Sequence, residues 1–175
     1  MADEAVKHEL TQEGYDEKQE ELHYRTVIYR AEIAQRIKEA REQGDLSENA
    51  EYDAARDEQR ENERKISELE EILKNVKIVG IDNQDTKEVK FGCTVKFEAL
   101  DAAGKKTKER KTFEYKIVGS KEADILSGKV SNESPVGKGL LGATVGQVVT
   151  IDTPNGPLKY KVLDFWSGKK PESRK

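Results

Sequence analysis

Apolar residues in the first part of the chain recur with the spacing of an amphipathic helix. The apolar or semi-apolar positions between residues 15 and 40 include Leu22, Tyr29, Ile33 and Ile37, while charged residues occupy the other faces and proline does not occur. This period indicates a long helix. Thr11 precedes the pattern and is a residue type that caps helix N-termini. We therefore predict a first helix that begins after Thr11.

A second segment has the stricter spacing of a coiled-coil seam, in which steps of three and four residues alternate. Its seam positions are Tyr52, Ala55, Gln59, Asn62, Ile66, Leu69, Leu73 and Val76. The pattern predicts a second helix that ends near Lys77. Because the seam positions Ala55, Gln59 and Asn62 near the turn are small or polar, this half of the helix pair should be slim. A slim half suits an arm that another protein surrounds, and it also occurs at poorly packed ends of ordinary coiled coils.

Gly44, Asp45 and Leu46 separate the two helical patterns. Gly44 suits the position that follows a helix, and Asp45 suits the start of the next helix. A connection this short predicts two neighbouring antiparallel helices. Residues 11–43 make an arm of roughly 50 Å at a rise of about 1.5 Å per residue.

The second half of the chain changes to alternating apolar and polar residues, which is the pattern of strands. We predict strands over residues 94–100, 112–118, 148–151 and 158–165. Asn155-Gly156 is a hairpin-turn signal between the last two. We expect a short helix or turn across the sheet at residues 137–142. We expect an exposed loop at residues 102–110.

Together these patterns predict an α+β protein with two domains. An N-terminal antiparallel two-helix coiled-coil hairpin should cover residues 1–77, and a small β-rich domain should cover residues 78–168. Residues 169–175 form a basic tail that we expect to be disordered.

Composition supports the division into two parts. The chain has 34% hydrophobic and 38% charged residues, which is too polar for one thick core but suits an extended hairpin. Residues 1–76 hold 12 basic and 22 acidic residues, a net charge of −10, so the remainder carries +6 of the total −4. This asymmetry predicts two surfaces with different partners, although solvated helix faces alone also produce such runs.

Cys93 is the single cysteine, which excludes an intrachain disulfide and a thiolate metal cluster. No apolar run resembles a signal sequence or reaches the roughly 20 residues that a membrane helix needs. We expect a soluble cytoplasmic protein that does not bind membranes.

Asp45 and Glu48 stand three residues apart at the predicted start of the second helix, so their side chains should lie on one face. This spacing has two explanations. It resembles a capping box, in which acids satisfy the amides of the first turn. It could also hold a divalent cation, but Mg²⁺ takes six oxygen ligands, so two carboxylates alone would bind it weakly. A functional pair would need a partner protein and a substrate phosphate to complete the site, as in two-metal phosphodiester chemistry.

The residues around this pair resemble the tip motif of the Gre family of bacterial transcript-cleavage factors. The resemblance is carried by Arg41-Glu42-Gln43-Gly44-Asp45-Leu46-Ser47-Glu48-Asn49-Ala50-Glu51-Tyr52, by residues 10–14, and by Ser134-Pro135-Val136-Gly137-Lys138-Gly139-Leu140-Leu141-Gly142. It covers essentially the whole chain. The strong acidity of the hairpin makes the GreA branch the closer resemblance and GreB the more distant one.

The resemblance implies that the hairpin enters the secondary channel of RNA polymerase and stimulates the polymerase's own cleavage of backtracked RNA. Asp45 and Glu48 would then hold a second magnesium ion jointly with the polymerase. Arg41 and Arg56 would face the 3′ segment of the RNA. The residues implied to shape the tip are Gly44, Leu46, Ser47, Asn49 and Tyr52.

The resemblance also implies a role for the second domain. It would have an FKBP-like fold that docks on the beta-prime subunit at the channel rim, with Ser134 and Pro135 at the docking surface. Because an antiparallel hairpin buries its own seam, we expect a monomer.

Three other readings stay open at this stage. A Gre-family homologue could occupy the channel without promoting cleavage, since activity depends on the exact placement of the tip. Gln43, Asp53 and residues 29–32, which lack the frequent Arg-Pro-Glu step, depart from the usual pattern and bear on the degree of activity more than on its kind. An FKBP-like isomerase or chaperone would use an aromatic pocket formed by the strands. A coiled-coil adaptor would have no chemistry, but it gives no reason for combining Asp45 and Glu48 with Arg41 and Arg56.

Overall fold

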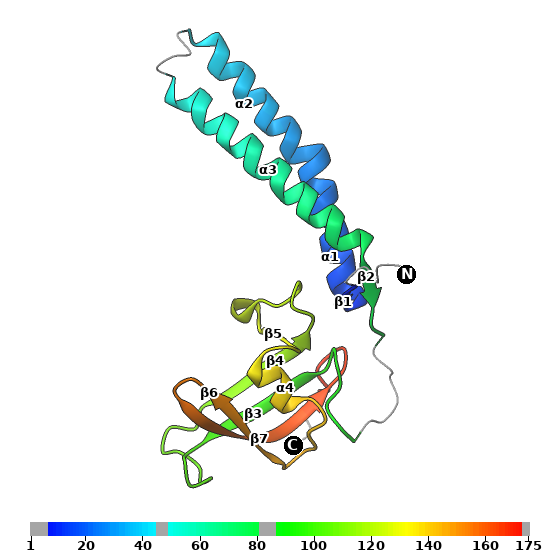
Figure 1. Cartoon of the computed structure of the whole chain (residues 1–175), viewed down its shortest axis with the longest axis vertical. Coiled ribbons are helices and arrows are strands. Elements are labelled where there is room, and N and C mark those ends of the chain that lie inside the picture. The colour runs from blue at the N-terminus through cyan, green and yellow to red at the C-terminus, as the bar shows by residue number, and fades with distance from the viewer. Residues whose placement is uncertain (1–6, 45–48, 81–86, 173–175) are drawn as a thin grey trace, which may run out of the picture. The chain divides into compact units, whose positions relative to one another are not determined.

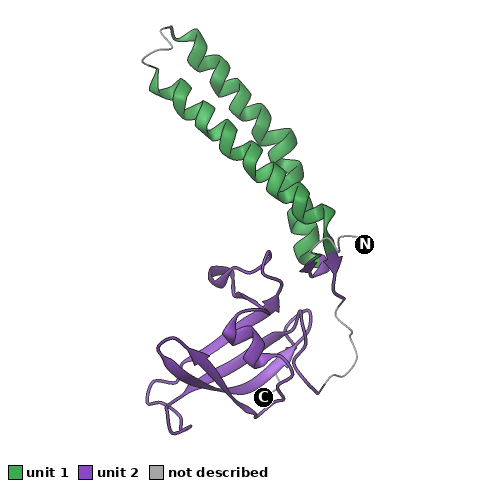
Figure 2. Cartoon of the chain, in the orientation of Figure 1, with its two compact units in different colours: residues 1–7, 13–76 green, residues 8–12, 77–175 purple. Residues whose placement is uncertain are grey.

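The computed structural model describes residues 7–44, 49–80 and 87–172. The chain forms two compact units, one comprising residues 1–7 and 13–76 and the other residues 8–12 and 77–175 (Figure 2). The sequence places residues 8–12 with the hairpin, whereas the structure places them with the second unit.

The first unit is the predicted antiparallel helical hairpin (Figure 1). The first arm consists of α1 (Gln12–His23), the π-helix η1 (Tyr24–Tyr29) and α2 (Arg30–Glu42), and the second arm is α3 (Ala50–Lys74). Thr11 immediately precedes α1, as predicted. The π-helix was not predicted, because the apolar spacing continues through it without a break.

The seam lies between the buried residues of the two arms. They are Ile33, Ile37 and Ala40 on the first arm and Ala55, Asn62, Ile66, Leu69 and Ile72 on α3. The predicted seam position Leu73 is less buried than Ile72. The second helix also ends earlier than predicted, at Lys74, because Val76–Ile78 forms strand β2, which pairs with β1 (His8–Leu10).

The second arm begins later than predicted. Asn49, not Asp45, is the N-cap of α3, which starts at Ala50, so the predicted helix start at Asp45 is wrong. The cap lies four residues later because the Asn49 side chain has partners on both helices, as described below.

The second unit is built on a curled sheet with strand order β5-β4-β3-β7-β6 (Figure 1). The strands are β3 (Thr94–Leu100), β4 (Thr112–Val118), β5 (Lys129–Ser131), β6 (Val148–Thr153) and β7 (Gly156–Trp166). The pairing of β4 with β5 is parallel and the other three pairings are antiparallel. The four longer strands were predicted, and β6 and β7 meet at the predicted Asn155-Gly156 turn.

The core of this unit lies against the sheet and is centred on Phe97, which is fully buried. Three aromatic rings surround Phe97 at centroid distances of 5.4, 5.8 and 5.1 Å, those of Phe113, Tyr115 and Tyr160. The predicted short helix is α4 (Pro135–Leu140), whose Leu140 is buried in the same core.

Residues 8–12 belong to the second unit because of buried contacts with the segment after β4. The amide and hydroxyl of Thr11 donate to the buried Glu122 carboxylate at 3.1 and 2.8 Å. A Cβ atom at Gly119 would lie 1.8 Å from the carbonyl oxygen of Glu9, so only glycine fits there. These partners are more than a hundred residues apart, and no local pattern predicts them.

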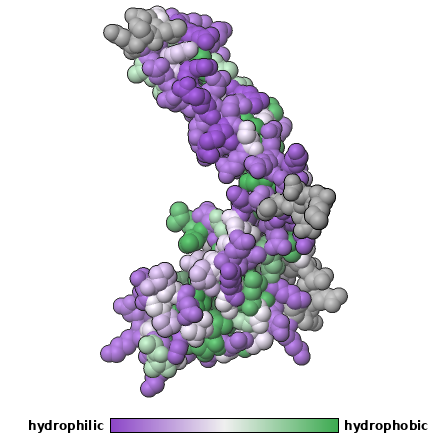
Figure 3. All heavy atoms as spheres, in the orientation of Figure 1, coloured by the Kyte–Doolittle hydropathy of each residue, from purple (hydrophilic) through white to green (hydrophobic). Residues whose placement is uncertain are grey.

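The surface of the hairpin visible in Figure 3 is mostly hydrophilic, in line with its charged composition. Among the helices that the structure describes, none combines the length and the apolarity required to cross a bilayer.

Candidate functional site

The candidate site is the end of the hairpin where the two arms are connected. The described residues do not include Asp45, Leu46, Ser47 and Glu48, so the metal pair and two of the tip-shaping residues remain predictions. The described residues on either side, 40–44 and 49–56, define how the connection is held. No group of three or more His, Cys, Asp or Glu side chains arranged for a metal occurs in the described ranges.

The first arm ends in a tightened turn. The amide of Gln43 donates to the carbonyl of Ala40 at 3.4 Å, and the amide of Gly44 donates to the carbonyl of Arg41 at 3.5 Å. Gly44 has a φ of 113°, which residues with a Cβ atom rarely adopt. Gly44 therefore follows the helix, as predicted.

Asn49 joins the two arms at the connection. Its side-chain oxygen accepts a hydrogen bond from the amide of Tyr52 at 3.1 Å, which caps the first turn of α3. Its side-chain amide donates to the carbonyl of Ala40 at 2.7 Å, in the last turn of α2. One carboxamide thus satisfies an unpaired group of each helix end. Only a side chain with both a donor and an acceptor can do this.

This dual role predicts a graded response to substitution of Asn49 in the full chain. Asn49→Ala removes both bonds and should lower the free energy of unfolding of the hairpin by about 1–2 kcal/mol. Asn49→Asp keeps the capping oxygen but cannot donate to Ala40, so it should recover most of the capping contribution. Urea denaturation followed by the helical circular dichroism signal measures both. Equal stability of wild type and Asn49→Ala would contradict the assignment.

Aromatic packing stiffens the arms next to the connection. Tyr52 and Tyr29 pack against the buried cluster of Ile33, Ile37 and Ala55. The exposed guanidinium of Arg41 lies over the Tyr52 ring, 5.8 Å from its centroid. Tyr52 is therefore a packing residue that also orients a cation at the end of the arm.

Arg56, the second predicted RNA-facing residue, lies one turn further along α3. Its guanidinium donates to the side-chain oxygen of Gln59 at 2.7 Å. Gln59 is neutral, so this bond orients Arg56 without neutralising its charge. The structure thus brings two arginines to the segments that flank the connection.

A shallow cavity of about 270 Å³ lies between α2 and α3 beside the connection. Ala40, Ala54 and Ala55 form part of its wall, so the space exists because these side chains are small. Sequence reasoning predicted the slim end from such residues, but it missed the polar cluster that the cavity adjoins.

That polar cluster is formed by Tyr29, Arg36 and Glu58. The Tyr29 hydroxyl donates to Glu58, and Arg36 forms an ion pair with the same carboxylate at 2.6 Å. The hydrogen bond from Tyr29, followed by the hydrogen bond and charge of Arg36, lowers the pKa of Glu58. The same bond to Glu58 raises the pKa of Tyr29. Glu58 therefore stays ionised and tethers α3 to α2 at neutral pH.

In the second unit, Ser134 and Pro135 begin α4. The Ser134 hydroxyl accepts from the amide of Gly137 at 3.0 Å and donates to the carbonyl of Ser131 at 2.6 Å. Pro135 occupies the first helical turn and is exposed. Both residues have a structural role at the helix start, and their predicted docking role stays a prediction.

The second unit also carries an apolar cavity of about 170 Å³. It is lined by Phe97, Phe113, Tyr115, Ile125, Val130, Val136 and Tyr160. Ile125 and its neighbour Leu126 are 70% and 98% exposed. The Asp124 carboxylate accepts from the amide of Leu126 and the hydroxyl of Ser127 at 3.1 and 2.6 Å, which holds this loop in shape. Sequence reasoning missed these two residues, because a short apolar pair in a loop gives no periodic signal.

Two family models together match most of the chain. The model described as "Transcription elongation factor, N-terminal" matches residues 8–78, and the model described as "Transcription elongation factor, GreA/GreB, C-term" matches residues 83–167. The boundary between the matches falls close to the boundary between the two units.

Curated relatives match over nearly their full length. A protein named transcription elongation factor GreA from Lachnoclostridium phytofermentans is 49% identical over 159 residues, covering 91% of this chain and 95% of that protein. A GreA protein from Caldanaerobacter subterraneus subsp. tengcongensis is 47% identical over 158 residues, covering 89% and 95%.

Solved structures are more distant. The crystal structure of GreA factor homolog 1 of Thermus thermophilus shares 27% identity and a TM-score of 0.39, covering 92% of this chain and 99% of that one. A GreA/GreB factor from Nitrosomonas europaea shares 25% identity and a TM-score of 0.37 over 57% of this chain and 77% of that one. On the two family models and the curated relatives, the chain belongs to the GreA/GreB family of transcription elongation factors.

Proposed function

We propose that this protein enters the secondary channel of RNA polymerase and stimulates the polymerase's own hydrolysis of backtracked RNA. The observation that carries the proposal is the role of Asn49 at the end of the hairpin. Because Asn49 ties the start of α3 to the last turn of α2, the two helix ends that flank Asp45 and Glu48 are held together. Helix ends held in this way would bring the two carboxylates to a defined place in a partner's catalytic centre.

The donor chemistry of Asp45 and Glu48 fits a magnesium ion. Carboxylate oxygens are the ligands that Mg²⁺ prefers, and two of them leave positions for water, substrate phosphate and carboxylates of the polymerase. A magnesium ion held jointly by the two proteins would lower the pKa of the attacking water. Within this chain, the roles of Asp45 and Glu48 are to supply anionic oxygens and to orient them. The protein has no reaction of its own in this proposal.

Arg41 and Arg56 would bind phosphates of the extruded RNA. Arginine has five donors and keeps its charge at any accessible pH, which suits phosphate recognition. The contacts with Tyr52 and Gln59 orient the two guanidinium groups without neutralising them. The RNA 3′ segment would therefore lie along the same end of the hairpin as the two acids.

The second unit would dock on the beta-prime subunit at the rim of the channel. Support comes from Ile125 and Leu126, which form an exposed apolar pair beside the apolar cavity and close in sequence to Ser134 and Pro135. Apolar side chains this exposed are typical of protein interaction sites. The factor would act as a monomer, since the arms bury their seam against each other.

The proposal is tested with a stalled, backtracked elongation complex that carries a labelled transcript. Adding the full-length protein with Mg²⁺ should shorten the RNA from its 3′ end and restore elongation, whereas the protein without polymerase should leave the RNA intact. Binding without cleavage would instead identify a factor that only occupies the channel. Cleavage in the absence of polymerase would contradict the proposal.

A further inference from the structure

The first arm of the hairpin contains a wide helical turn, within which the Thr26 hydroxyl also donates to the carbonyls of Leu22 and His23 at 2.7 and 3.2 Å. Helix η1 (Tyr24–Tyr29) lies between two α-helical segments, and the amide of Arg30 donates to the carbonyl of Arg25, five residues earlier. Neither proline nor glycine occurs within it. A π-turn contains one residue more than an α-turn and is intrinsically rare. Helix distortions without proline or glycine generally have a side chain or water inserted into the hydrogen-bond ladder.

Asn62 of α3 is the side chain that reaches this turn. Its side-chain amide donates to the carbonyl of Arg25 at 3.2 Å, and its side-chain oxygen accepts from the guanidinium of Arg25 at 3.3 Å. The Arg25 carbonyl thus receives two donors, one from the π-turn and one from the opposite arm. Asn62 is only 2% exposed, so its carboxamide depends on these partners.

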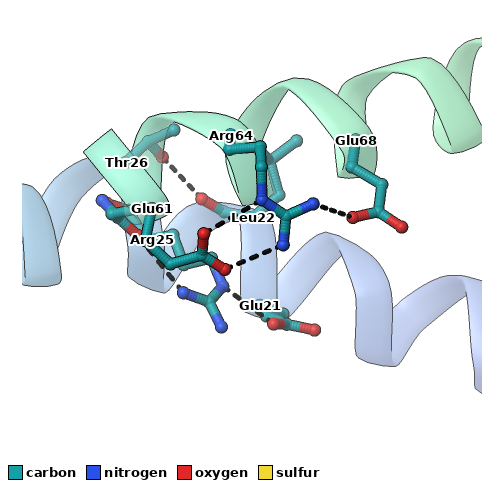
Figure 4. A network of polar contacts seen from close by, with 8 residues as sticks. Glu21, Leu22, Arg25, Thr26, Glu61, Arg64 and Glu68 are labelled. Carbon is teal, nitrogen blue, oxygen red and sulfur yellow. Dashed lines mark hydrogen bonds and ion pairs between the residues drawn. The ribbon is translucent and has the colours of Figure 1, made fainter. Parts of the chain in front are cut away.

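Further polar contacts surround Arg25 on both arms (Figure 4). Its guanidinium forms an ion pair with Glu21 at 2.8 Å, and the Thr26 hydroxyl donates to the carbonyl of Leu22 at 2.7 Å. On α3, Arg64 pairs with Glu61 and Glu68 at 2.8 and 3.4 Å. Each of these contacts lies within one arm. The Asn62–Arg25 pair crosses between the arms at the π-turn, as do the more exposed pairs of Tyr29 with Glu58 and of Arg30 with Glu63, but only Asn62 among these side chains of α3 is buried.

A polar residue in an otherwise apolar seam selects one register at a cost in stability. An asparagine that slides by one turn would lose both partners and leave buried polar groups unsatisfied. Leucine at the same position would pack in several registers and would leave the Arg25 carbonyl with its π-type donor alone. The first arm could then return to a regular α-helix, which rotates the segments before and after the turn relative to each other by about 100°.

We propose that Asn62 is a positioning residue for the end of the hairpin. By holding the π-turn at Arg25, it fixes the register in which the two arms meet and therefore the placement of the ends of α2 and α3, which flank residues 45–48, relative to the base of the arm. This inference rests on the proposed function, because the register matters for activity only if the connection must reach a partner's catalytic centre.

The test compares Asn62→Leu with Ile66→Val in the full chain. Ile66 is buried in the seam one turn further along α3, so Ile66→Val perturbs the packing and leaves the Asn62 contacts intact. Nitroxide labels on cysteines at Glu20 and Asp53, in a Cys93→Ala background, report the separation of the two arms along their length. Both labelled positions are exposed. Unlabelled proteins are used for melting and for cleavage of backtracked complexes.

For Asn62→Leu we expect a shifted distribution of the distance between the two labels and a melting temperature equal to or above that of wild type. The cleavage rate at saturating factor should fall by about 100-fold, because a small misplacement of reacting groups has an effect of this size. For Ile66→Val we expect the wild-type distance and cleavage rate with a lower melting temperature. An unchanged distance in Asn62→Leu would overturn the proposal, and so would a melting temperature below that of Ile66→Val.

The two readouts separate this inference from the proposed function. If the wild-type protein stimulates no cleavage, the proposed function fails, whereas the distance measurement still decides whether Asn62 sets the register. If wild type stimulates cleavage and Asn62→Leu shifts the distance but cleaves normally, the role of Asn62 in placing the acids is wrong while the proposed function stands.

Discussion

Replacing Asp45 by asparagine and Glu48 by glutamine in one protein is expected to abolish stimulation of RNA cleavage and to leave folding and polymerase binding unchanged. The variant keeps the shape of both side chains and removes the anionic oxygens that magnesium prefers. The cleavage rate at saturating factor should fall by about 100-fold or more, as for loss of a general acid–base or electrostatic group.

The structure gives a reason to expect normal folding of this variant. The first turn of α3 is capped by Asn49, so neither substituted residue supplies the capping hydrogen bond. The melting temperature should therefore match that of wild type. A remaining change of about 0.5 kcal/mol in the free energy of unfolding would shift it by only about 1 °C. A large drop in melting temperature would show that the acids stabilise the helix end instead.

A matched control removes the same charge from the same region. Glu42→Gln with Glu51→Gln also raises the net charge by two, at exposed positions on either side of the connection. This control should retain cleavage, because Glu42 and Glu51 lie within the helices and not on the connection. The magnesium concentration that gives half-maximal cleavage should rise for the first variant alone. Full cleavage by the Asp45/Glu48 variant would refute the metal role of this pair.

Replacing Ile125 and Leu126 by aspartate is expected to weaken binding to the polymerase by roughly 10- to 100-fold without destabilising the fold. Both side chains are largely exposed, so the change removes little packing within the unit. At an interface, however, it would bury two charges against an apolar surface, and a few residues commonly account for most of the binding energy of an interface.

Titration of the factor against a backtracked complex distinguishes this defect from the tip defect. The half-saturating concentration should rise, and the maximal cleavage rate should approach that of wild type once the complex is saturated. Val145→Asp is the control, because Val145 is 57% exposed in the same unit and does not line the apolar cavity. Wild-type affinity of the Ile125/Leu126 variant would place the docking surface elsewhere.

The sequence by itself determined the elements whose signals are local. The helical period of residues 15–40 and the seam from Tyr52 predicted the hairpin, and the alternation of apolar residues predicted β3, β4, β6 and β7 within two residues of most boundaries. These patterns suffice because each element buries one face, so its period is written in neighbouring residues. The motif at residues 41–52 likewise indicated the family before any fold was known.

Tertiary structure decided the features that depend on distant partners. The start of α3 moved from Asp45 to Ala50 because Asn49 bonds to Ala40 on the other helix. The π-turn receives a hydrogen bond from Asn62, which lies 37 residues beyond Arg25. Residues 8–12 joined the second unit through Glu122. Strand β5 has only three residues and exists through its pairing with β4. In each case a side chain or backbone group is satisfied by an atom that only the folded chain brings near, and spacing along the sequence carries no record of that contact.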